Sequence, residues 1–339
     1  MTLQFMEQRP LNPMLVTCPY CQKPHNIGIH SHQERRYKCH ACGRTFAETK
    51  GTMFYGLQYP VWVVILVVAL LSHGCPVAAI VAAFSLDERT VILWLNKAGL
   101  HAKTIQEQMV CAGQVDVGHV QLDELCVTTQ LGKIWVATAM SVFSRLFLWG
   151  EVSQRRDKAL ILSVLDHVKA AAVSHTDAVL FAVDGFAAYP KAILKTFFTK
   201  VSSGRPGRPR HVPWPNLHIV QVIKSRSGMK LKAITRKLVH GNLQQAYEII
   251  HQTQVGLGLI NTAFIERLNG TFRSRMPSFV RRTRSLAGTS GRLDTEMFWS
   301  SVVYNFCTIH DTLQGTPAMA AGLTEEVWSV SDLLWRRLL

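Results

Sequence analysis

The sequence predicts a multidomain chain: a cysteine-rich module at about 14–50, a small all-α unit at about 55–108, and an α/β domain with a mixed sheet from about 113 to 339. Three observations predict this order. Two CxxC pairs lie near the N-terminus, short helical segments follow them, and the hydrophobic pattern changes to strand periodicity near Val115. At roughly 100–200 residues per domain, the chain has room for two or three domains.

The composition indicates a folded and strongly basic protein. Hydrophobic residues make up 48% of the chain and charged residues 17%, which supports a sizeable core and excludes a disordered tail. The net charge is +15. A protein this basic usually binds a polyanion such as nucleic acid, with a membrane surface as the other common partner. The cations crowd the stretches 205–237 and 267–284, although any one of them would also fit an ordinary solvated surface.

Half of the eight cysteines form two CxxC pairs: Cys18, Cys21, Cys39 and Cys42. Each pair can turn two thiolates toward one half of a tetrahedral site, and two pairs about 15–20 residues apart have the spacing of a zinc ribbon. The sequence therefore predicts a zinc ribbon at 14–50 with one structural Zn²⁺, and four unrelated cysteines are the alternative. Three cations between the pairs are expected to contact DNA phosphates: Arg35, Arg36 and Lys38.

The segment Pro60–Leu71 is an unbroken apolar run. Because crossing a bilayer takes about 20 apolar residues, we expect a buried helix here rather than a membrane span. Met1–Pro13 has no apolar core of the kind found in a secretory signal. The remaining cysteines are scattered, which is typical of a reducing compartment, so we expect a cytoplasmic protein without a membrane partner.

Three short helices are expected in the all-α unit. The apolar run forms the first, Val77–Phe84 the second, and Glu88–Ala98 the third, which is expected to end near Gly99. This arrangement matches a helix-turn-helix in which the third helix enters the major groove of DNA. Arg89 and Lys97 are then the expected contacts to DNA. A helical spacer or a dimerisation unit is the alternative.

The α/β domain is expected to begin with strands and to continue with helices. The expected strands are Val115–Thr128, Ile134–Ala139, Leu146–Glu151, Ala178–Asp184 and His218–Ile223. Asp157–Ala172 reads as an amphipathic helix, and the chain is largely helical after Asn242. The Pro- and Gly-rich stretch at 202–215 is expected to be a basic surface loop.

Three acids stand out by their context. Asp123 lies inside an apolar strand, Asp184 ends another, and Glu266 lies on a helix. Charged residues rarely sit in apolar strands without a partner, and two divalent ions about 3.5–4 Å apart would be a suitable one. Glu124 follows Asp123, and strand alternation predicts that the two point to opposite faces. Taken alone, Glu266 could instead be a surface acid paired with a neighbouring arginine.

Five sequence blocks carry a resemblance to a known family. They read CPYC…CHAC, VQLDEL, VDGFAAYP, NTAFIERLNGTFRSRMPSFVRRTR and YNFCTIHDTLQGTPAMAAGLT, in this order over nearly the whole chain. The chain resembles the DDE transposases of insertion sequences. It is most similar to the insertion sequence one family, in the branch with a zinc ribbon and a helix-turn-helix ahead of the catalytic domain.

The resemblance implies a ribonuclease-H-like catalytic domain with the metal-binding triad Asp123, Asp184 and Glu266, 61 and 82 residues apart. It implies two Mg²⁺ or Mn²⁺ ions, binding of double-stranded DNA at terminal inverted repeats, cleavage at the element end, and joining of the 3′-hydroxyl to target DNA. It also implies a homo-oligomer assembled on DNA in the prokaryotic nucleoid. A non-catalytic zinc-ribbon and helix-turn-helix DNA-binding protein derived from a transposase is the main alternative, and a small membrane protein with a zinc-binding head is a second.

Further residues are expected to contact DNA. Asn269 and Arg273 share a helix face with Glu266, which predicts a place near the scissile phosphate. His310 is a lesser candidate, and a structural histidine is its alternative. The segment 204–210 resembles a minor-groove clamp, with a flexible linker as the alternative. The remaining expected contacts are Arg275, Arg281, Arg282, Arg284, Arg205, Arg208 and Arg210.

Overall fold

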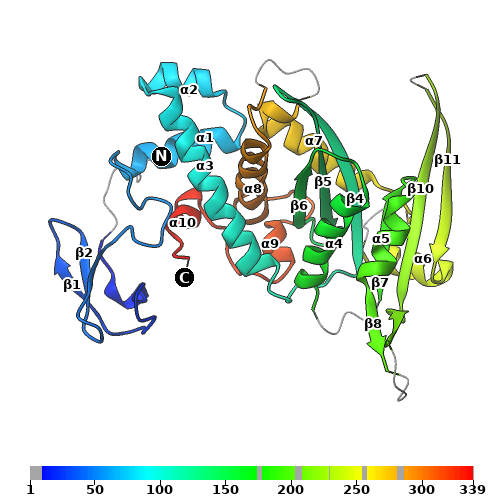
Figure 1. Cartoon of the computed structure of the whole chain (residues 1–339), viewed down its shortest axis with the longest axis horizontal. Coiled ribbons are helices and arrows are strands. Elements are labelled where there is room, and N and C mark those ends of the chain that lie inside the picture. Colours follow the sequence, from blue (N-terminus) through cyan, green and yellow to red (C-terminus); the bar gives the residue numbers. More distant parts are fainter. Residues whose placement is uncertain are drawn as a thin grey trace.

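A computed structural model of the chain describes residues 10–173, 178–202, 208–228, 230–253, 258–280 and 286–338. A cysteine-rich module, a group of helices and a twisted sheet follow one another along the longest axis of the molecule (Figure 1). Four of the arginines that the sequence analysis expects to contact DNA lie outside the described residues: Arg205, Arg281, Arg282 and Arg284.

The cysteine-rich module is a small antiparallel sheet of three strands, preceded by the 3₁₀ turn Pro13–Leu15. Its strands are β1 (Ile27–Ser31), β2 (Arg36–Cys39) and β3 (Thr45–Ala47), in the order β1-β2-β3. The core holds little more than Val16, Tyr37 and Phe46 beside the cysteines. So few apolar side chains support a stable fold poorly without a further link such as a metal ion.

The helical unit consists of α1 (Val61–Ser72), α2 (Val77–Phe84) and α3 (Glu88–Ile105), which continues into one π-helical turn at Gln106–Val110. The first two helices lie close to where the sequence predicts them. The third does not end at Gly99, because that residue lies where α3 crosses α8 (Ser290–Cys307). A Cβ atom at Gly99 would come within 2.3 Å of the carbonyl oxygen of Thr295. Here a helical glycine marks close helix packing rather than a helix end.

These helices share one hydrophobic core with the rest of the chain, because buried side chains of α1 and α3 belong to the same cluster as those of the sheet and of α8. Trp299 of α8 donates from Nε1 to the carbonyl of Val68 in α1, over 2.8 Å. Among the described residues, no helix is both long enough and apolar enough to cross a bilayer.

The large sheet has six strands in the order β11-β10-β7-β4-β5-β6. The strands are β4 (His119–Thr129), β5 (Gly132–Ser141), β6 (Phe147–Ser153), β7 (Val179–Asp184), β10 (Leu217–Ser227) and β11 (Lys230–His240). The pairs β4–β7 and β7–β10 are parallel and the other neighbours are antiparallel. A mixed sheet is therefore present, as predicted, whereas β11 was not expected from the sequence.

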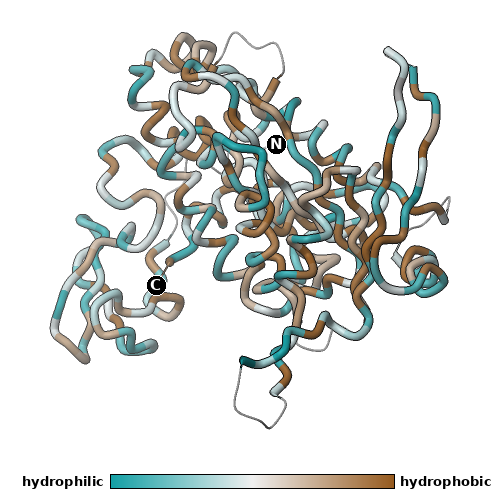
Figure 2. The backbone as a smooth tube through the Cα atoms, turned by 45° about the vertical axis from the view of Figure 1, so that its right-hand side comes forward, coloured by the Kyte–Doolittle hydropathy of each residue, from teal (hydrophilic) through white to brown (hydrophobic). Residues whose placement is uncertain are grey.

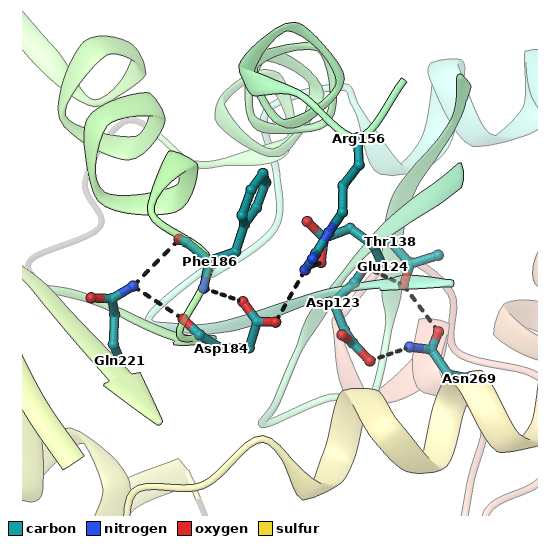
Figure 3. A network of polar contacts seen from close by, with 8 residues as sticks. All are labelled: Asp123, Glu124, Thr138, Arg156, Asp184, Phe186, Gln221 and Asn269. Carbon is teal, nitrogen blue, oxygen red and sulfur yellow. Dashed lines mark hydrogen bonds and ion pairs between the residues drawn. The ribbon is translucent and has the colours of Figure 1, made fainter. Parts of the chain in front are cut away.

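Helices cover both faces of this sheet (Figures 1 and 3). The helices α4 (Lys158–Ala171) and α5 (Ala188–Thr196) lie on one face, and α6 (Leu243–Thr253) and α7 (Ala263–Arg275) lie on the other. The stretch at 202–215 is not entirely a loop, because β9 (Arg210–Pro213) pairs with β8 (Phe198–Val201). The shorter elements are the 3₁₀ turn Pro277–Phe279, α9 (Pro317–Ala320) and α10 (Val330–Trp335).

The C-terminal segment ties the cysteine-rich module to the body of the molecule. Arg337 donates to the carbonyls of Lys50 and Glu48, over 2.6 and 2.5 Å. The backbone N–H of Leu338 donates to the carbonyl of Gly51. These bonds connect parts of the chain nearly 290 residues apart, so the placement of the module depends on the last residues of the protein.

Candidate metal centres and nucleic-acid-contacting residues

The first candidate metal centre is the cluster of Cys18, Cys21, Cys39 and Cys42, whose four sulfur atoms lie within 4.8 Å of one another. Cys18 Sγ is 3.7 Å from Cys42 Sγ, and Cys21 Sγ is 3.7 Å from Cys39 Sγ. Four sulfurs at this spacing fit the tetrahedral thiolate site that zinc prefers. The structure therefore brings together the four ligands that the CxxC spacing predicts.

The surroundings of Cys39 favour a thiolate. Burial alone would raise its pKa, but the backbone N–H groups of Cys42 and Ala41 and the thiols of Cys21 and Cys18 lower that pKa to about 7. A thiolate is the form that binds a metal ion. In the same cluster the pKa of Cys21 is raised to about 11, although a backbone hydrogen bond from Lys23 opposes the rise, so metal binding at this site releases protons.

The second candidate centre is an acidic group formed by Asp123, Glu124 and Asp184, which offer carboxylate oxygens within 4.8 Å of one another. β4 pairs with β7 from His119↔Leu180 to Gln121↔Ala182. The same offset places Asp123 opposite Asp184, two residues further on. Two acids far apart in the sequence thus become neighbours because their strands run parallel and in this register.

Glu124 reaches this group from the other face of the sheet. Strand alternation turns its side chain away from Asp123, toward α5 and the phenol of Tyr189. Beyond Gln121 the pairing between β4 and β7 has ended, so the carboxylates of both faces can approach one another at this edge. The side chain of Glu124 is fully buried. Glu124 thus lies on the face opposite Asp123, as strand alternation predicts (Figure 3), whereas its place in the acidic group was not expected.

Arg156 bridges two of the three acids (Figure 3). One guanidinium nitrogen lies 3.2 Å from Glu124 Oε2 and 3.3 Å from Asp184 Oδ2. The same guanidinium stacks over the rings of Phe186 and Trp135, 4.3 and 5.1 Å from their centroids. A cationic side chain thus occupies the position in which these acids would hold a metal ion.

Burial makes ionisation of this group costly. It raises the pKa of Glu124 to about 7, although the bond to Arg156 opposes the shift. Burial also raises the pKa of Asp123, and the neighbouring charges of Asp184 and Glu266 add to that rise. Oε1 of Glu124 and the hydroxyl of Tyr189 are both buried, and they are close enough for the phenol to lower the pKa of Glu124, but neither atom makes a well-aligned hydrogen bond. A bound cation would lower the free energy of the charged form of all three acids.

Asn269 of α7 holds Asp123 in place. Its Nδ2 donates to Asp123 Oδ2 over 2.8 Å, and its Oδ1 accepts from Thr138 Oγ1 over 3.1 Å (Figure 3). Gln121 fixes the start of the same helix, because its Oε1 accepts from the backbone N–H of Ile265 and its Nε2 donates to the carbonyl of Asn261. These buried amides set the distance between α7 and β4.

Glu266 lies on α7, one turn before Asn269, but outside the group of three acids. Its Oε1 accepts from Lys224 Nζ and, over 2.6 Å, from Thr262 Oγ1. Its charge contributes to the raised pKa of Asp123, so the two carboxylates are still electrostatic neighbours. The structure thus brings Asp123 and Asp184 of the predicted triad together. Glu266 lies beside them, paired with Lys224.

Gln221 orients the loop after β7. Its Nε2 donates to the carbonyls of Asp184 and Phe186, over 3.2 and 3.3 Å, and the N–H of Phe186 donates back to Asp184 Oδ1 over 2.8 Å. Sequence reasoning missed Gln221, Arg156 and Lys224 as parts of this site. The available signal for Gln221 and Lys224 was that each is a polar residue in a strand with many apolar residues, whereas Arg156 follows β6 by three residues and has no such signal.

Some of the expected DNA contacts are engaged within the protein. Arg35 pairs with Glu48 through two hydrogen bonds of 2.5 and 2.8 Å, and Arg36 donates to Thr45. Lys97 donates to the carbonyl of Tyr55 over 2.6 Å, and Arg275 donates to Thr308 Oγ1. Arg273 is half-buried on α7, whereas the exposed members of the set are Lys38, Arg89, Arg208 and Arg210.

His310 lies away from the carboxylates. Its ring packs edge-on against Tyr304, with 4.9 Å between centroids, and burial lowers its pKa. Arg145, Arg275 and Arg267 stand nearby and lower that pKa further. His310 lies between α8 and α9 rather than on a helix, and its Nε2 is buried without a hydrogen-bond partner, so the expected helix histidine with a structural hydrogen bond is not found.

The comparisons with other proteins leave the family open. No protein-family model matches the chain, and no curated protein is similar to it in sequence.

Proposed function

We propose that this chain is a metal-dependent enzyme that cleaves DNA and joins its 3′-end to another DNA, as a DDE transposase does, and that its α/β domain is ribonuclease-H-like. The observation that carries the proposal is the group of Asp123, Glu124 and Asp184 on adjacent parallel strands. Carboxylates in this arrangement suit two hard cations of the Mg²⁺ type. The net charge of +15 makes a polyanion the natural substrate.

The three carboxylates would hold the ions, and Glu266 would join them once a phosphate takes Lys224 away. When bound, divalent ions polarise a phosphodiester and stabilise its leaving oxygen. Asn269 keeps Asp123 in position through its 2.8 Å hydrogen bond. Arg156 and Lys224 can turn from the acids to the oxygens of the bound phosphate, because both pairs involve long, flexible side chains at a partly exposed edge.

The cysteine-rich module and the helical unit would supply DNA binding. Four thiolates that fit zinc hold a strand bearing the exposed Lys38, and α3 presents the exposed Arg89 at its N-terminus. Lysines and arginines that contact the phosphates of a duplex raise the affinity of the protein for DNA of any sequence, and this affinity falls strongly as the salt concentration rises. The terminal inverted repeats of an insertion sequence are the proposed specific substrate, in a multimer assembled on DNA.

The direct test is cleavage of a duplex that carries the DNA flanking the gene, in the presence of Mg²⁺ or Mn²⁺. Asp184→Asn is expected to reduce cleavage at least about a hundredfold while leaving binding intact, because the change removes a ligand without removing a surface cation. Asp166→Asn, on the exposed side of α4, is the matched control. Cleavage by Asp184→Asn at the wild-type rate would contradict the proposed site.

A second outcome of the same experiment distinguishes the proposed enzyme from the main alternative, a non-catalytic DNA-binding protein. If the wild-type protein binds the duplex but never cleaves it with any divalent ion, the chain is a non-catalytic DNA-binding protein.

A further inference from the structure

We propose that the free ribbon, residues 223–227 of β10 and 230–235 of β11, is an arm that lies along duplex DNA beside the acidic group. The proposal rests on the proposed function in one respect, because it takes DNA as the ligand of this protein. It adds a specific DNA-binding element outside the expected zinc ribbon and helix-turn-helix.

The ribbon extends beyond the body of the sheet. β10 pairs with β7 only from Leu217 to Val222, whereas its pairing with β11 continues to Ser227↔Lys230. Past Val222 no third strand among the described residues pairs with them, and Figures 1 and 2 show them projecting from the molecule. Every residue of the segment 230–235 is exposed. An isolated pair of strands exposed on both faces is marginally stable in water, which favours a binding partner.

The charged residues of β10 and β11 all have one sign. Between Leu217 and His240 the sequence has no acidic residue and six lysines and arginines. Lys230 and Lys232 are exposed on the ribbon itself. Lys224 at its root contacts Glu266, and Arg236 donates to the carbonyl of Ile260. Within the described part of the chain no acid pairs with Lys230 or Lys232, so a polyanion outside the chain can neutralise them.

The position of the ribbon relates it to the proposed chemistry. Its root residue Val222 is the register partner of Asp184, so the ribbon leaves the sheet at the same edge as the acidic group. At about 3.3 Å per residue, the five outer residues of β10 extend roughly 17 Å, the length of about five base pairs. A DNA backbone lying over Asp184 would continue along the ribbon. The major groove of B-DNA admits a two-stranded ribbon of this kind.

Self-association is the competing use of the same surface. The exposed apolar side chains Ile223, Leu231 and Ile234 could pair with those of a second copy. Two identical ribbons would then bring lysines of the same sign together without an acid between them, which is unfavourable. A phosphate backbone instead matches the lysines, and the apolar side chains can contact base edges such as the thymine methyl group.

The test uses the full-length protein with Lys230→Gln and Lys232→Gln combined, and a fluorescent duplex of about three helical turns. Binding is measured by anisotropy in Ca²⁺ at several salt concentrations, so that cleavage does not interfere. The double variant is expected to bind roughly tenfold more weakly, and the slope of log K against log salt is expected to fall by about two. The control exchanges the exposed α5 lysines, Lys191→Gln and Lys195→Gln, and is expected to keep the wild-type slope.

Three results would overturn the proposal. The first is an unchanged affinity and slope in the double variant. The second is an unchanged affinity for DNA together with a loss of self-association in analytical ultracentrifugation, which would assign the ribbon to a second copy. Duplex RNA of the same sequence serves as a further probe, since its deep and narrow major groove excludes a ribbon, and equal losses on both duplexes would also contradict a groove-bound arm.

Failure of the ribbon is distinguishable from failure of the enzyme. If the double variant binds DNA like the wild type and still cleaves it, the DNA-binding role of the ribbon is refuted and the catalytic proposal stands. If the double variant loses DNA binding but the wild-type protein never cleaves DNA, the catalytic proposal is refuted and the DNA-binding role of the ribbon stands.

Discussion

Nδ2 of Asn269 lies 2.8 Å from Oδ2 of Asp123, and this hydrogen bond joins α7 to β4 across the proposed metal site. The bond crosses 146 residues of sequence. It links the helix that carries Glu266 to the strand that carries Asp123, so the amide sets how closely the third predicted acid can approach the other two.

Replacing this amide should weaken metal binding without removing a ligand. Asn269→Ala leaves Asp123 without its side-chain donor, and the pKa of that acid should rise further. We expect Mn²⁺ affinity to fall about 10–100-fold, the usual effect of losing a group that orients a ligand. Titration calorimetry measures it. Gly270→Ala is the control, since a Cβ atom there meets nothing within 4 Å. Equal affinities for the two variants would contradict the positioning role of Asn269.

Removing Arg156 should make the fold depend more strongly on a divalent ion. Its guanidinium is the hydrogen-bonded cation of the buried Glu124, and breaking such a pair costs about 3–5 kcal/mol. We expect Arg156→Ala to melt at a lower temperature without metal and to gain more from Mn²⁺ than the wild type does. The neighbouring exposed Arg155→Ala is the control. If Mn²⁺ stabilises both variants equally, Arg156 and the ion do not share a site.

Glu124 should make stability fall as the pH rises. Its pKa is raised to about 7 in the folded chain from about 4.5, so between these values the folded state keeps a proton that the unfolded state has lost. Relative to Glu124→Gln, wild-type stability should therefore decline from about pH 4.5 to about pH 7, by up to roughly 3 kcal/mol.

Denaturant unfolding at several pH values measures this difference, with Glu325→Gln, an exposed acid, as control. Mg²⁺ should reduce the decline, because it binds the charged form. A difference between wild type and Glu124→Gln that does not vary with pH would refute the assignment.

Zinc removal should release the cysteine-rich module and the C-terminus together. We expect Cys39→Ser to abolish binding of one Zn²⁺ per chain, and Cys75→Ser, outside the cluster, to keep it. In hydrogen exchange, the metal-free protein should lose protection at 14–50 and near Arg337, whose guanidinium donates to the carbonyls of Glu48 and Lys50. Protection of β4 and β7 should not change. Full protection at 14–50 after chelation would show that the module folds without metal.

Particular residues show what the sequence could and could not predict. The CxxC spacing predicted the sulfur cluster, because its ligands come in local pairs. The apolar strands around Asp123 and Asp184 predicted a mixed sheet that brings these two acids together. Gly99 misled the prediction of the end of α3, since a glycine at a helix crossing and one at a helix end look alike in sequence.

The features that the sequence did not predict depend mostly on contacts between residues far apart in the chain. The entry of Glu124 into the acidic group depends on where the pairing of β4 with β7 ends, and the hold of Lys224 on Glu266 depends on the length of β10. Neither has a local sequence signal. β11 escaped prediction because its first half, residues 230–235, is exposed on both faces and lacks the alternation of buried and polar residues that marks a strand.

The most direct measurement of the central claim is anomalous diffraction from crystals grown with Mn²⁺. The account predicts a manganese peak between the carboxylates of Asp123, Glu124 and Asp184, with Arg156 displaced from Glu124 and Asp184, and no such peak in Asp184→Asn. A wild-type crystal at saturating Mn²⁺ with Arg156 still bridging the two acids and no manganese among them would contradict it.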